Sequence, residues 1–442
     1  MKTRRMPTFV DVFAGCGGLS LGLLQAGWKG LFAIEADRFA FETLKHNLLS
    51  DGPYSYDWPS WLPQQRRNIR GFIEAYREHL EPLAGKVDLV VGGPPCQGFS
   101  LAGRRKKNDP RNWLFKHYVE LIKLLRPPLL FFENVRGVTI VHGKKHRPRR
   151  QGPGRPPTPF SVKIQKKLDE IGYTVFPRLV RAMDYGVPQL RPRYIMIAVD
   201  RELLANRPEY DPYARLDAAR SNFLRAKGLP TDRPVTVREA ISDLVVEGKK
   251  LVPCEDVLGY ERITYGRPAT TYQRLLHGEM SGDSPNSLRL AKHRNEIRKR
   301  FARILKNCRS GVQLSPTERK RLGINKQCVV ALSPDQPSHT LTSLPDDLIH
   351  YSEPRILNVR EYARLQSFPD WYAFKGKYTT GGSLRIKECP RYTQVANAVP
   401  PFLAEFLGQF LDGIRTELFG AESGQLAACC RDLECRTMKT PG

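Results

Sequence analysis

The sequence has no long apolar run. A helix that crosses a membrane needs about 20 consecutive apolar residues, and no stretch of the 442 residues approaches that length. Basic residues precede an apolar segment at the N-terminus, but Asp11 and a glycine cluster interrupt that segment, which excludes a secretion signal. The sequence therefore predicts no membrane partner.

Acidic residues are scarce. The 45 Asp and Glu residues stand against 71 Lys and Arg residues, so the formal net charge is +26. Solubility alone does not require such an excess, which predicts a polyanionic partner, with nucleic acid first and an anionic membrane surface second. Hydrophobic residues still make up 40% of the chain, which argues against wholesale disorder.

Paired cysteines are also lacking. The nine cysteines contain no CxxC pair, and the cluster of Cys429, Cys430 and Cys435 has no histidine nearby. This spacing is typical neither of a disulfide framework nor of a zinc site. We therefore predict no metal and expect a reducing, cytoplasmic compartment.

The first 200 residues alternate β-prone apolar runs with helix-like stretches. Strands are expected at residues 8–14, 29–35, 87–91, 129–133 and 194–199, and helices at 19–26 and 113–125. This alternation predicts βαβ units, and hence an α/β fold with a mainly parallel sheet.

The composition changes after residue 200. Residues 201–335 have weak periodicity and many Arg, Lys and Pro residues, so they are expected to form a second, smaller and irregular domain. Regular patterns return over residues 336–419, which include an amphipathic stretch at 401–419. Residues 420–442 are expected to be a flexible tail.

A glycine-rich turn follows the first expected strand, in the segment DVFAGCGGLSLG at residues 11–22. Such a turn lets the backbone approach a nucleotide-like ligand closely. The dinucleotide fingerprint GxGxxG would require glycine where Ser20 stands, which disfavours pyrophosphate binding. Glu35 ends the next strand and is placed to take two ribose hydroxyls. These features favour S-adenosylmethionine; the alternative is a tight turn without a ligand.

Cys96 differs from the other cysteines in its setting. It lies in GGPPCQGFS at residues 92–100, directly after an apolar strand, where open α/β sheets place their sites. Prolines stiffen the approach and glycines allow close packing. Most cysteines are inert, but this setting is that of a presented nucleophile.

Six motifs together resemble those of the DNA (cytosine-5)-methyltransferases. Besides the two segments above, they are FFENV at 131–135, QLRPR at 189–193, REYARLQSFPD at 360–370 and QVANAVP at 394–400. The motifs follow the family's order over most of the chain. The resemblance, closest to bacterial modification enzymes, implies a Rossmann-like, S-adenosylmethionine-dependent methyltransferase. Residues 1–200 and 336–419 would form the catalytic and cofactor-binding domain, and 201–335 the target-recognition domain.

The resemblance implies four catalytic residues. C5 of cytosine is a poor nucleophile, so Cys96 would first add to C6. Glu133 would engage N3 and the exocyclic amine while negative charge develops on the ring. Arg191 and Arg193 would hold the O2 side and the Cys96 loop. The plainer alternatives are an ion pair between Glu133 and Arg136, and arginines that pair with phosphate or lie at the surface.

The cofactor contacts also carry over from the motifs. They are Phe13, Gly15, Gly17, Gly18, Leu19, Glu35, Pro95 and Asn397. The chain departs from the family where an aspartate usually accepts a hydrogen bond from the adenine amine. The nearest match is Asn68, whose amide oxygen could accept the same bond.

The expected substrate is double-stranded DNA, from which the target base must be flipped into a pocket. Basic segments at 104–107 and 289–306 would contact phosphates. The sequence does not identify a cognate restriction endonuclease, which the resemblance makes a candidate partner. A monomer associated with the nucleoid is expected.

Three other functions are compatible with parts of this sequence. A tRNA cytosine-5 methyltransferase would have a short recognition region, whereas about 135 residues lie between 201 and 335. The intact set of Cys96, Glu133 and Arg191 argues against a catalytically silent DNA-binding homologue. Ser20 argues against a nicotinamide-dependent oxidoreductase.

Overall fold

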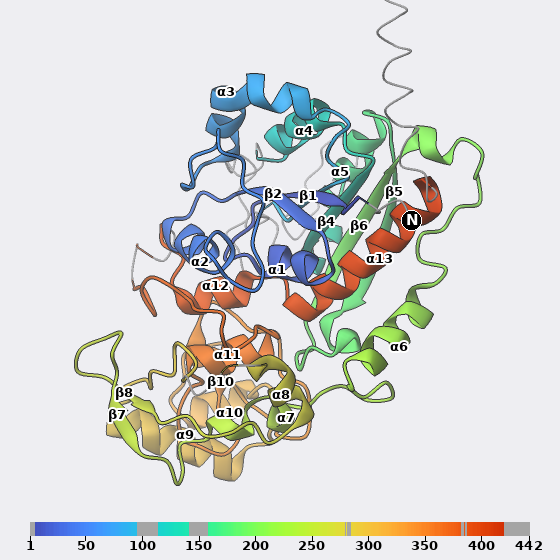
Figure 1. Ribbon diagram of the computed structural model, residues 1–442. Helices are drawn as coiled ribbons and strands as arrows, with labels where there is room; N and C mark the ends of the chain where they lie inside the picture. The colour runs from blue at the N-terminus through green and yellow to red at the C-terminus, as the bar shows by residue number, and fades with distance from the viewer. Residues whose placement is uncertain are drawn as a thin grey trace, which may run out of the picture.

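A six-stranded sheet forms the centre of the computed structural model (Figure 1). The structure describes residues 5–94, 114–140, 158–278, 280, 284–381, 384 and 387–419. The strand order is β2-β1-β3-β4-β6-β5. The strands are β1 (Thr8–Val12), β2 (Lys29–Ile34), β3 (Leu89–Gly92), β4 (Leu129–Val135), β5 (Tyr173–Arg181) and β6 (Pro192–Asp200).

Most of this sheet is parallel. Strand β1 pairs in parallel with β2 and β3, and β3 pairs in parallel with β4. Strand β6 runs antiparallel to both of its neighbours, β4 and β5. The expected α/β fold with a mainly parallel sheet is therefore confirmed.

Strand β5 was not expected from the sequence. It contains Pro177, which has no backbone N–H and so normally argues against a strand in the middle of a sheet. In the structure β5 lies at the edge, where it pairs only with β6 and where a missing donor is tolerated.

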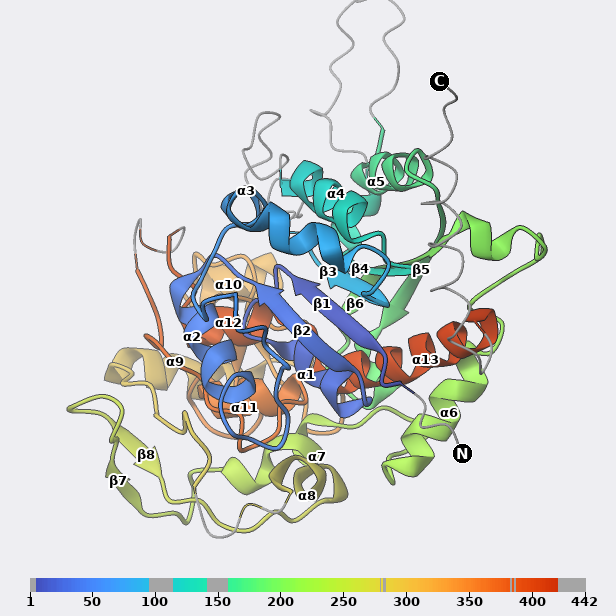
Figure 2. The ribbon, with the colours of Figure 1, turned by 45° about the horizontal axis from the view of Figure 1, so that its top comes forward.

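Helices cover both faces of the sheet, because successive strand residues point to opposite sides. In β4, Leu129 and Phe131 enter one core cluster, whereas Leu130 and Phe132 enter the other. Figure 2 shows the two helical layers with the sheet between them. One layer contains α3 (Ile69–Leu80), α4 (Leu114–Leu125) and α5 (Phe160–Asp169); the other contains α1 (Gly18–Gln25) and α13 (Pro401–Phe419).

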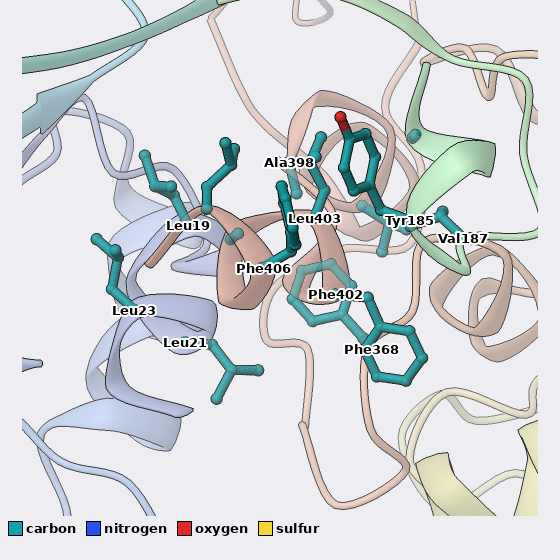
Figure 3. Packing of buried hydrophobic residues seen from close by; sticks show 14 of the residues in the cluster. Leu19, Leu21, Leu23, Tyr185, Val187, Phe368, Ala398, Phe402, Leu403 and Phe406 are labelled. Carbon is teal, nitrogen blue, oxygen red and sulfur yellow. The ribbon is translucent and has the colours of Figure 1, made fainter. Parts of the chain in front are cut away.

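The last helix, α13, packs directly on the first helix, α1. Figure 3 shows side chains of the two helices in one cluster, with Phe368 beside Phe402. Trp28 Nε1 donates a hydrogen bond to the Gly408 carbonyl over 2.8 Å. A Cβ on Gly22 would lie 2.4 Å from Ala404 Cβ, so the helices approach backbone to backbone.

Residues 201–335 divide between two cores. Helix α6 packs on α13, and its Phe223 and Leu224 join the main cluster, whereas Phe301 of α9 and Leu322 belong to a small separate cluster. The predicted domain boundaries stay predictions.

The elements after β6 are α6 (Leu216–Ala226), α7 (Val237–Ile241), β7 (Leu251–Pro253), β8 (Glu261–Ile263), α8 (Thr271–His277), α9 (Asn295–Asn307), α10 (Pro316–Arg321), β9 (Val330–Ala331), β10 (Leu348–Ile349), α11 (Val359–Leu365) and α12 (Arg391–Asn397). Helix α2 (Arg38–Leu48) follows β2.

The close approach of α1 and α13 predicts the effect of one added methyl group. Gly22→Ala should destabilise the fold by about 1–3 kcal/mol, because the α13 backbone stands where the methyl would lie. Gly413→Ala is the matched control, since its Cβ would meet nothing within 4 Å. That change should stabilise α13 by about 0.5–1 kcal/mol. Urea unfolding measures both, and equal effects would contradict the packing.

Candidate functional site

Three of the predicted site residues follow neighbouring parallel strands at the carboxyl end of the sheet. Val12 pairs in register with Ile34 on one side and Gly92 on the other, and Gly92 pairs with Phe132. The residues that follow these positions therefore lie at the same edge, where parallel sheets bind their ligands. They are Phe13, Glu35, Gly93 and Glu133.

The glycines after β1 have two different roles. A Cβ on Gly15 would meet nothing within 4 Å, so this glycine faces open space. By contrast, a Cβ on Gly17 would lie 2.7 Å from the Tyr372 hydroxyl, and one on Gly18 would lie 2.4 Å from the Val399 carbonyl oxygen. Gly15 thus leaves room for a ligand, whereas Gly17 and Gly18 allow the loop to pack. Phe13 begins the turn with a positive φ of 65°.

Glu35 connects the end of β2 to the glycine loop. Its Oε2 accepts a hydrogen bond from the Gly15 N–H at 2.8 Å, and its Oε1 accepts one from the Asp37 N–H at 2.7 Å. Burial raises the pKa of this carboxyl, and the two backbone donors oppose the rise. A carboxylate has about four acceptor positions, so the partly exposed Glu35 keeps capacity for ribose hydroxyls.

Asp11 is a buried residue of β1. Its Oδ2 accepts a hydrogen bond from Ser20 Oγ at 2.5 Å, and Ser20 Oγ accepts one from the Tyr56 hydroxyl at 2.7 Å. Its Oδ1 has no hydrogen-bond partner among the described residues. Burial, together with the nearby charge of Glu35, raises the pKa of Asp11 to about 7. Ser20, which spoils the dinucleotide fingerprint, is therefore a hydrogen-bond donor to a buried carboxyl.

Three other predicted cofactor residues lie around the same loop. Asn68 is exposed at the start of α3, where its Oδ1 accepts a hydrogen bond from the Gly71 N–H at 2.8 Å. Asn397 is exposed at the end of α12, next to the segment that packs on Gly18. Leu19 is buried in the core, so only its backbone, in the first turn of α1, can face a ligand.

Glu133 pairs with Arg193 rather than with Arg136. Glu133 Oε1 lies 2.6 Å from Arg193 Nε, and the two side chains are only 11% and 7% exposed. The antiparallel register of β4 and β6, which sets Val135 opposite Arg193, brings the pair together. The structure thus joins two of the predicted catalytic residues in one ion pair.

The predicted nucleophile loop begins beside this ion pair. Cys96 and Pro95 lie outside the described residues, which reach Pro94. The Pro94 carbonyl accepts a hydrogen bond from Asn134 Nδ2 at 3.0 Å, and a Cβ on Gly93 would lie 3.3 Å from Glu133 Oε2. Asn134, which sequence reasoning did not single out, therefore anchors the start of the loop.

Cys16, which shares the glycine loop, is a poor candidate for a nucleophile. Its side chain is 1% exposed, and burial raises the pKa of its thiol to about 12. Its Sγ lies 3.5 Å from the Gln394 carbonyl oxygen. It is therefore a packing residue.

Arg191 is buried behind the ion pair. Its Nη2 donates to the Ala398 carbonyl at 2.7 Å, and its Nη1 donates to Gln189 Oε1 at 3.5 Å. Burial, and next the charge of Arg193, lower the pKa of this guanidinium. These contacts make Arg191 a connection to the last motif, whereas Arg193 alone contacts Glu133.

Two buried glutamines connect three motifs that are far apart in the sequence. Gln189 Nε2 donates to Gln366 Oε1 at 2.8 Å. Gln366 Nε2 donates to the carbonyls of Val395 and Ala398 at 2.7 and 3.1 Å. Sequence reasoning assigned neither glutamine a role, although both stand in the motifs that it quoted.

Comparison with known proteins agrees with these motifs. Residues 7–411 match the family model of C-5 cytosine-specific DNA methylases. The type II methyltransferase M.XorII of Xanthomonas oryzae pv. oryzae is 30% identical over 430 residues, which cover 92% of this chain and 85% of that protein. M.DdeI of Desulfomicrobium norvegicum, also a type II methyltransferase, is 30% identical over 412 residues, which cover 90% and 87%.

The fold is similar to that of a protein of known structure. It is a prophage-encoded Escherichia coli protein described as a DNA modification methyltransferase. The two structures agree with a TM-score of 0.59 at 23% identity, over 93% of this chain and 99% of that one. This likeness supports the architecture.

The raised pKa of Asp11 predicts how stability depends on pH. The pKa of Asp11 is about 7 in the folded chain against an ordinary value of 3.8, so the folded chain holds an extra proton at pH values between the two. The free energy of unfolding should therefore fall as pH rises from 3.8 toward 7, by at most about 1.4 kcal/mol for each pH unit.

Asp11→Asn removes this titration and should flatten the decrease. Urea unfolding between pH 5 and pH 8 tests the difference, with Asp57→Asn at the surface as a control that should follow the wild type. Parallel curves for wild type and Asp11→Asn would show that Asp11 is ionised throughout.

Proposed function

The chain belongs to the C-5 cytosine-specific DNA methylase family, and from this premise we propose how its residues act. As a member of this family it is a DNA cytosine-5 methyltransferase, and its relatives are type II methyltransferases. We propose that it acts on a flipped-out cytosine in a specific double-stranded sequence, through a covalent bond between Cys96 and C6. The observation that carries the proposal is the ion pair of Glu133 and Arg193 beside the start of the Cys96 loop.

In the proposed reaction this ion pair stabilises the negative charge that develops on the cytosine ring. Bond formation between Cys96 Sγ and C6 moves electron density toward N3 and O2 of the cytosine. Glu133, which takes up a proton when the base binds, shares that proton with N3, and the Arg193 guanidinium stabilises the O2 side. The activated C5 then takes the methyl group. A base removes the C5 proton, and the electron pair of that C–H bond re-forms the C5–C6 double bond and expels Cys96 as a thiolate, which restores the ring. Arg191 holds β6 to the last motif, which keeps Arg193 in place.

The residues at the carboxyl ends of β1 and β2 fit S-adenosylmethionine as the methyl donor. When bound, this cofactor supplies an electrophilic methyl group on a sulfonium. The Glu35 carboxylate would accept hydrogen bonds from the ribose hydroxyls, and the open space at Gly15 leaves room beside it. The exposed Asn68 would accept a hydrogen bond from the adenine amine, and the exposed Asn397 would also contact the cofactor. Phe13, at the turn, would pack against it.

Charge supports DNA as the partner. Helix α9 carries the exposed side chains of Arg298, Lys299, Arg303 and Lys306, and Glu296 is its one acidic residue. A protein surface of this kind contacts phosphates without regard to sequence. None of the helices in the described part of the chain has the length and apolar character of a membrane span. A cognate endonuclease, the monomeric state and a place at the nucleoid stay predictions.

The covalent step predicts a trapped complex. DNA with 5-fluorocytosine at the target should hold the wild type covalently, because fluorine cannot leave as the C5 proton does. The substrate is a duplex that contains the target site, found by bisulfite sequencing of plasmid DNA from expressing cells. A slowly migrating band on a denaturing gel should appear with the wild type and with Cys16→Ser, but not with Cys96→Ala. A band that persists in Cys96→Ala would overturn the assignment.

Replacing the Glu133 carboxyl predicts a separation of turnover from binding. Glu133→Gln should lower the single-turnover rate by about 10²–10⁴-fold, because the carboxyl acts on charge that develops only after attack. Affinity for DNA should change little. Glu120→Gln, which alters an exposed carboxylate paired with Arg77, is the control. A folded Glu133→Gln variant that methylates within a few-fold of wild type would make Glu133 structural.

A further inference from the structure

Asn68 lies beside the segment of Glu35, although the two residues are far apart in the sequence. The Arg67 N–H donates a hydrogen bond to the Glu35 carbonyl at 2.7 Å. Arg66 Nη1 donates to the Ala36 carbonyl at 3.1 Å. The chain just before α3 is therefore held along the chain just after β2. A nucleoside whose ribose hydroxyls bind the Glu35 carboxylate carries its base on the same ribose, so that base lies within reach of Asn68.

The helix cap fixes the orientation of the Asn68 side chain. Asn68 is the N-cap residue of α3, and its Oδ1 accepts a hydrogen bond from the Gly71 N–H at 2.8 Å. Only the oxygen of an amide can accept. A flipped amide would set its NH₂ group against the Gly71 N–H, donor against donor. Oδ1 is therefore held toward the helix, and the exposed side chain keeps Nδ2 without a partner among the residues that the structure describes.

An amide held in this way differs from a carboxylate in what it offers to a base. A carboxylate has acceptors only, whereas the amide of Asn68 has an acceptor and a donor side by side. Adenine has the matching pattern, because its exocyclic amine donates and the ring nitrogens on either side of it, N1 and N7, accept. Asparagine pairs with adenine through two such hydrogen bonds. The second lone pair of Oδ1 remains for the amine while the first accepts from Gly71.

We propose that Asn68 binds the adenine of the cofactor with both halves of its amide. Oδ1 accepts from the amine, Nδ2 donates to the ring nitrogen beside it, and the Gly71 N–H holds the amide in the orientation that this pattern requires. Asn68 thereby selects adenine against hypoxanthine, which has a carbonyl where adenine has the amine. The proposal deepens the proposed function and rests on S-adenosylmethionine as its cofactor.

The first test measures the donated hydrogen bond by calorimetry on the full chain. The ligands are S-adenosylhomocysteine and two analogues in which N1 or N7 is replaced by C–H. One analogue should bind wild type about 2–10-fold more weakly than the parent, which is the change expected for one net hydrogen bond. Asn68→Asp keeps an oxygen for Gly71 and for the amine but has no donor, so it should bind this analogue and the parent equally.

The comparison of ligands within one variant removes the effect of charge. The negative charge that Asn68→Asp adds acts alike on all three ligands and cancels in the ratio of affinities. Asn206→Asp, which makes the same change at another exposed residue, should keep the wild-type ratios. An equal loss in Asn68→Asp would mean that another group donates, such as the Ile69 N–H, which has no partner within the helix. That result, or no loss with either analogue in wild type, would overturn the proposal.

The second test concerns the orientation of the amide. Wild type should bind S-inosylhomocysteine about tenfold or more weakly than S-adenosylhomocysteine, because the hypoxanthine carbonyl would face Oδ1, acceptor against acceptor. Gly71→Pro removes the N–H that holds Oδ1, and the first turn of a helix tolerates proline. The amide can then turn, so the difference between the two ligands should shrink.

Gly71→Ala is the matched control, since it keeps the N–H and its Cβ would lie 3.4 Å from Asn68 Oδ1, an ordinary contact. It should keep the wild-type difference between the two ligands. Equal differences in folded Gly71→Pro and Gly71→Ala would overturn the fixed orientation, and the first test does not depend on either variant. Failure of the proposed function would show differently, as a wild type that binds neither S-adenosylhomocysteine nor any of its analogues.

Discussion

The hydrogen bond between the side-chain amides of Gln189 and Gln366 is the contact on which the geometry of the site depends. Through Gln366 it reaches the Ala398 carbonyl, which also accepts from Arg191. Residues 398 and 399 pack against Gly18, at the start of α1. Because every donor and acceptor in this group is buried, loss of one partner would leave others unsatisfied at a cost of about 1–3 kcal/mol each. The arrangement therefore holds the glycine loop, β6 and the last motif in one relative position.

The two halves of the site differ in which groups stabilise their carboxylates. On the side of the glycine loop, the buried Asp11 lies near the partly exposed Glu35, and the charge of Glu35 opposes the ionisation of Asp11. Backbone N–H groups stabilise Glu35, whereas Asp11 keeps its proton up to a pH of about 7. On the side of the nucleophile loop, Glu133 has the full positive charge of Arg193 beside it. The first half suits neutral hydroxyl ligands, and the second suits a ring that gains negative charge.

Helix α11 connects residues 201–335, the predicted recognition region, to the buried glutamines and the candidate site. Arg360 and Arg364 are fully buried on it, where Arg360 Nε donates to the Asn286 carbonyl and Arg364 pairs with Asp243 and Asp370. Gln366 follows the same helix directly. A buried charge is tolerated only when it is paired and hydrogen-bonded. The segments that hold Asp243 and Asn286 are therefore positioned by the same element that positions the candidate site.

The sequence by itself determined the strands that end at the site, the glycine turn, and the motif residues that lie there, because these depend on local periodicity and on residue type at a short spacing. It did not determine β5, since Pro177 is acceptable only at a sheet edge and edge position is a property of the whole sheet. Nor did it determine that Glu133 pairs with Arg193, that Ser20 serves Asp11, or that Arg191 turns toward Ala398. Each of these contacts joins separate elements, and only the tertiary structure decided which buried donor met which acceptor.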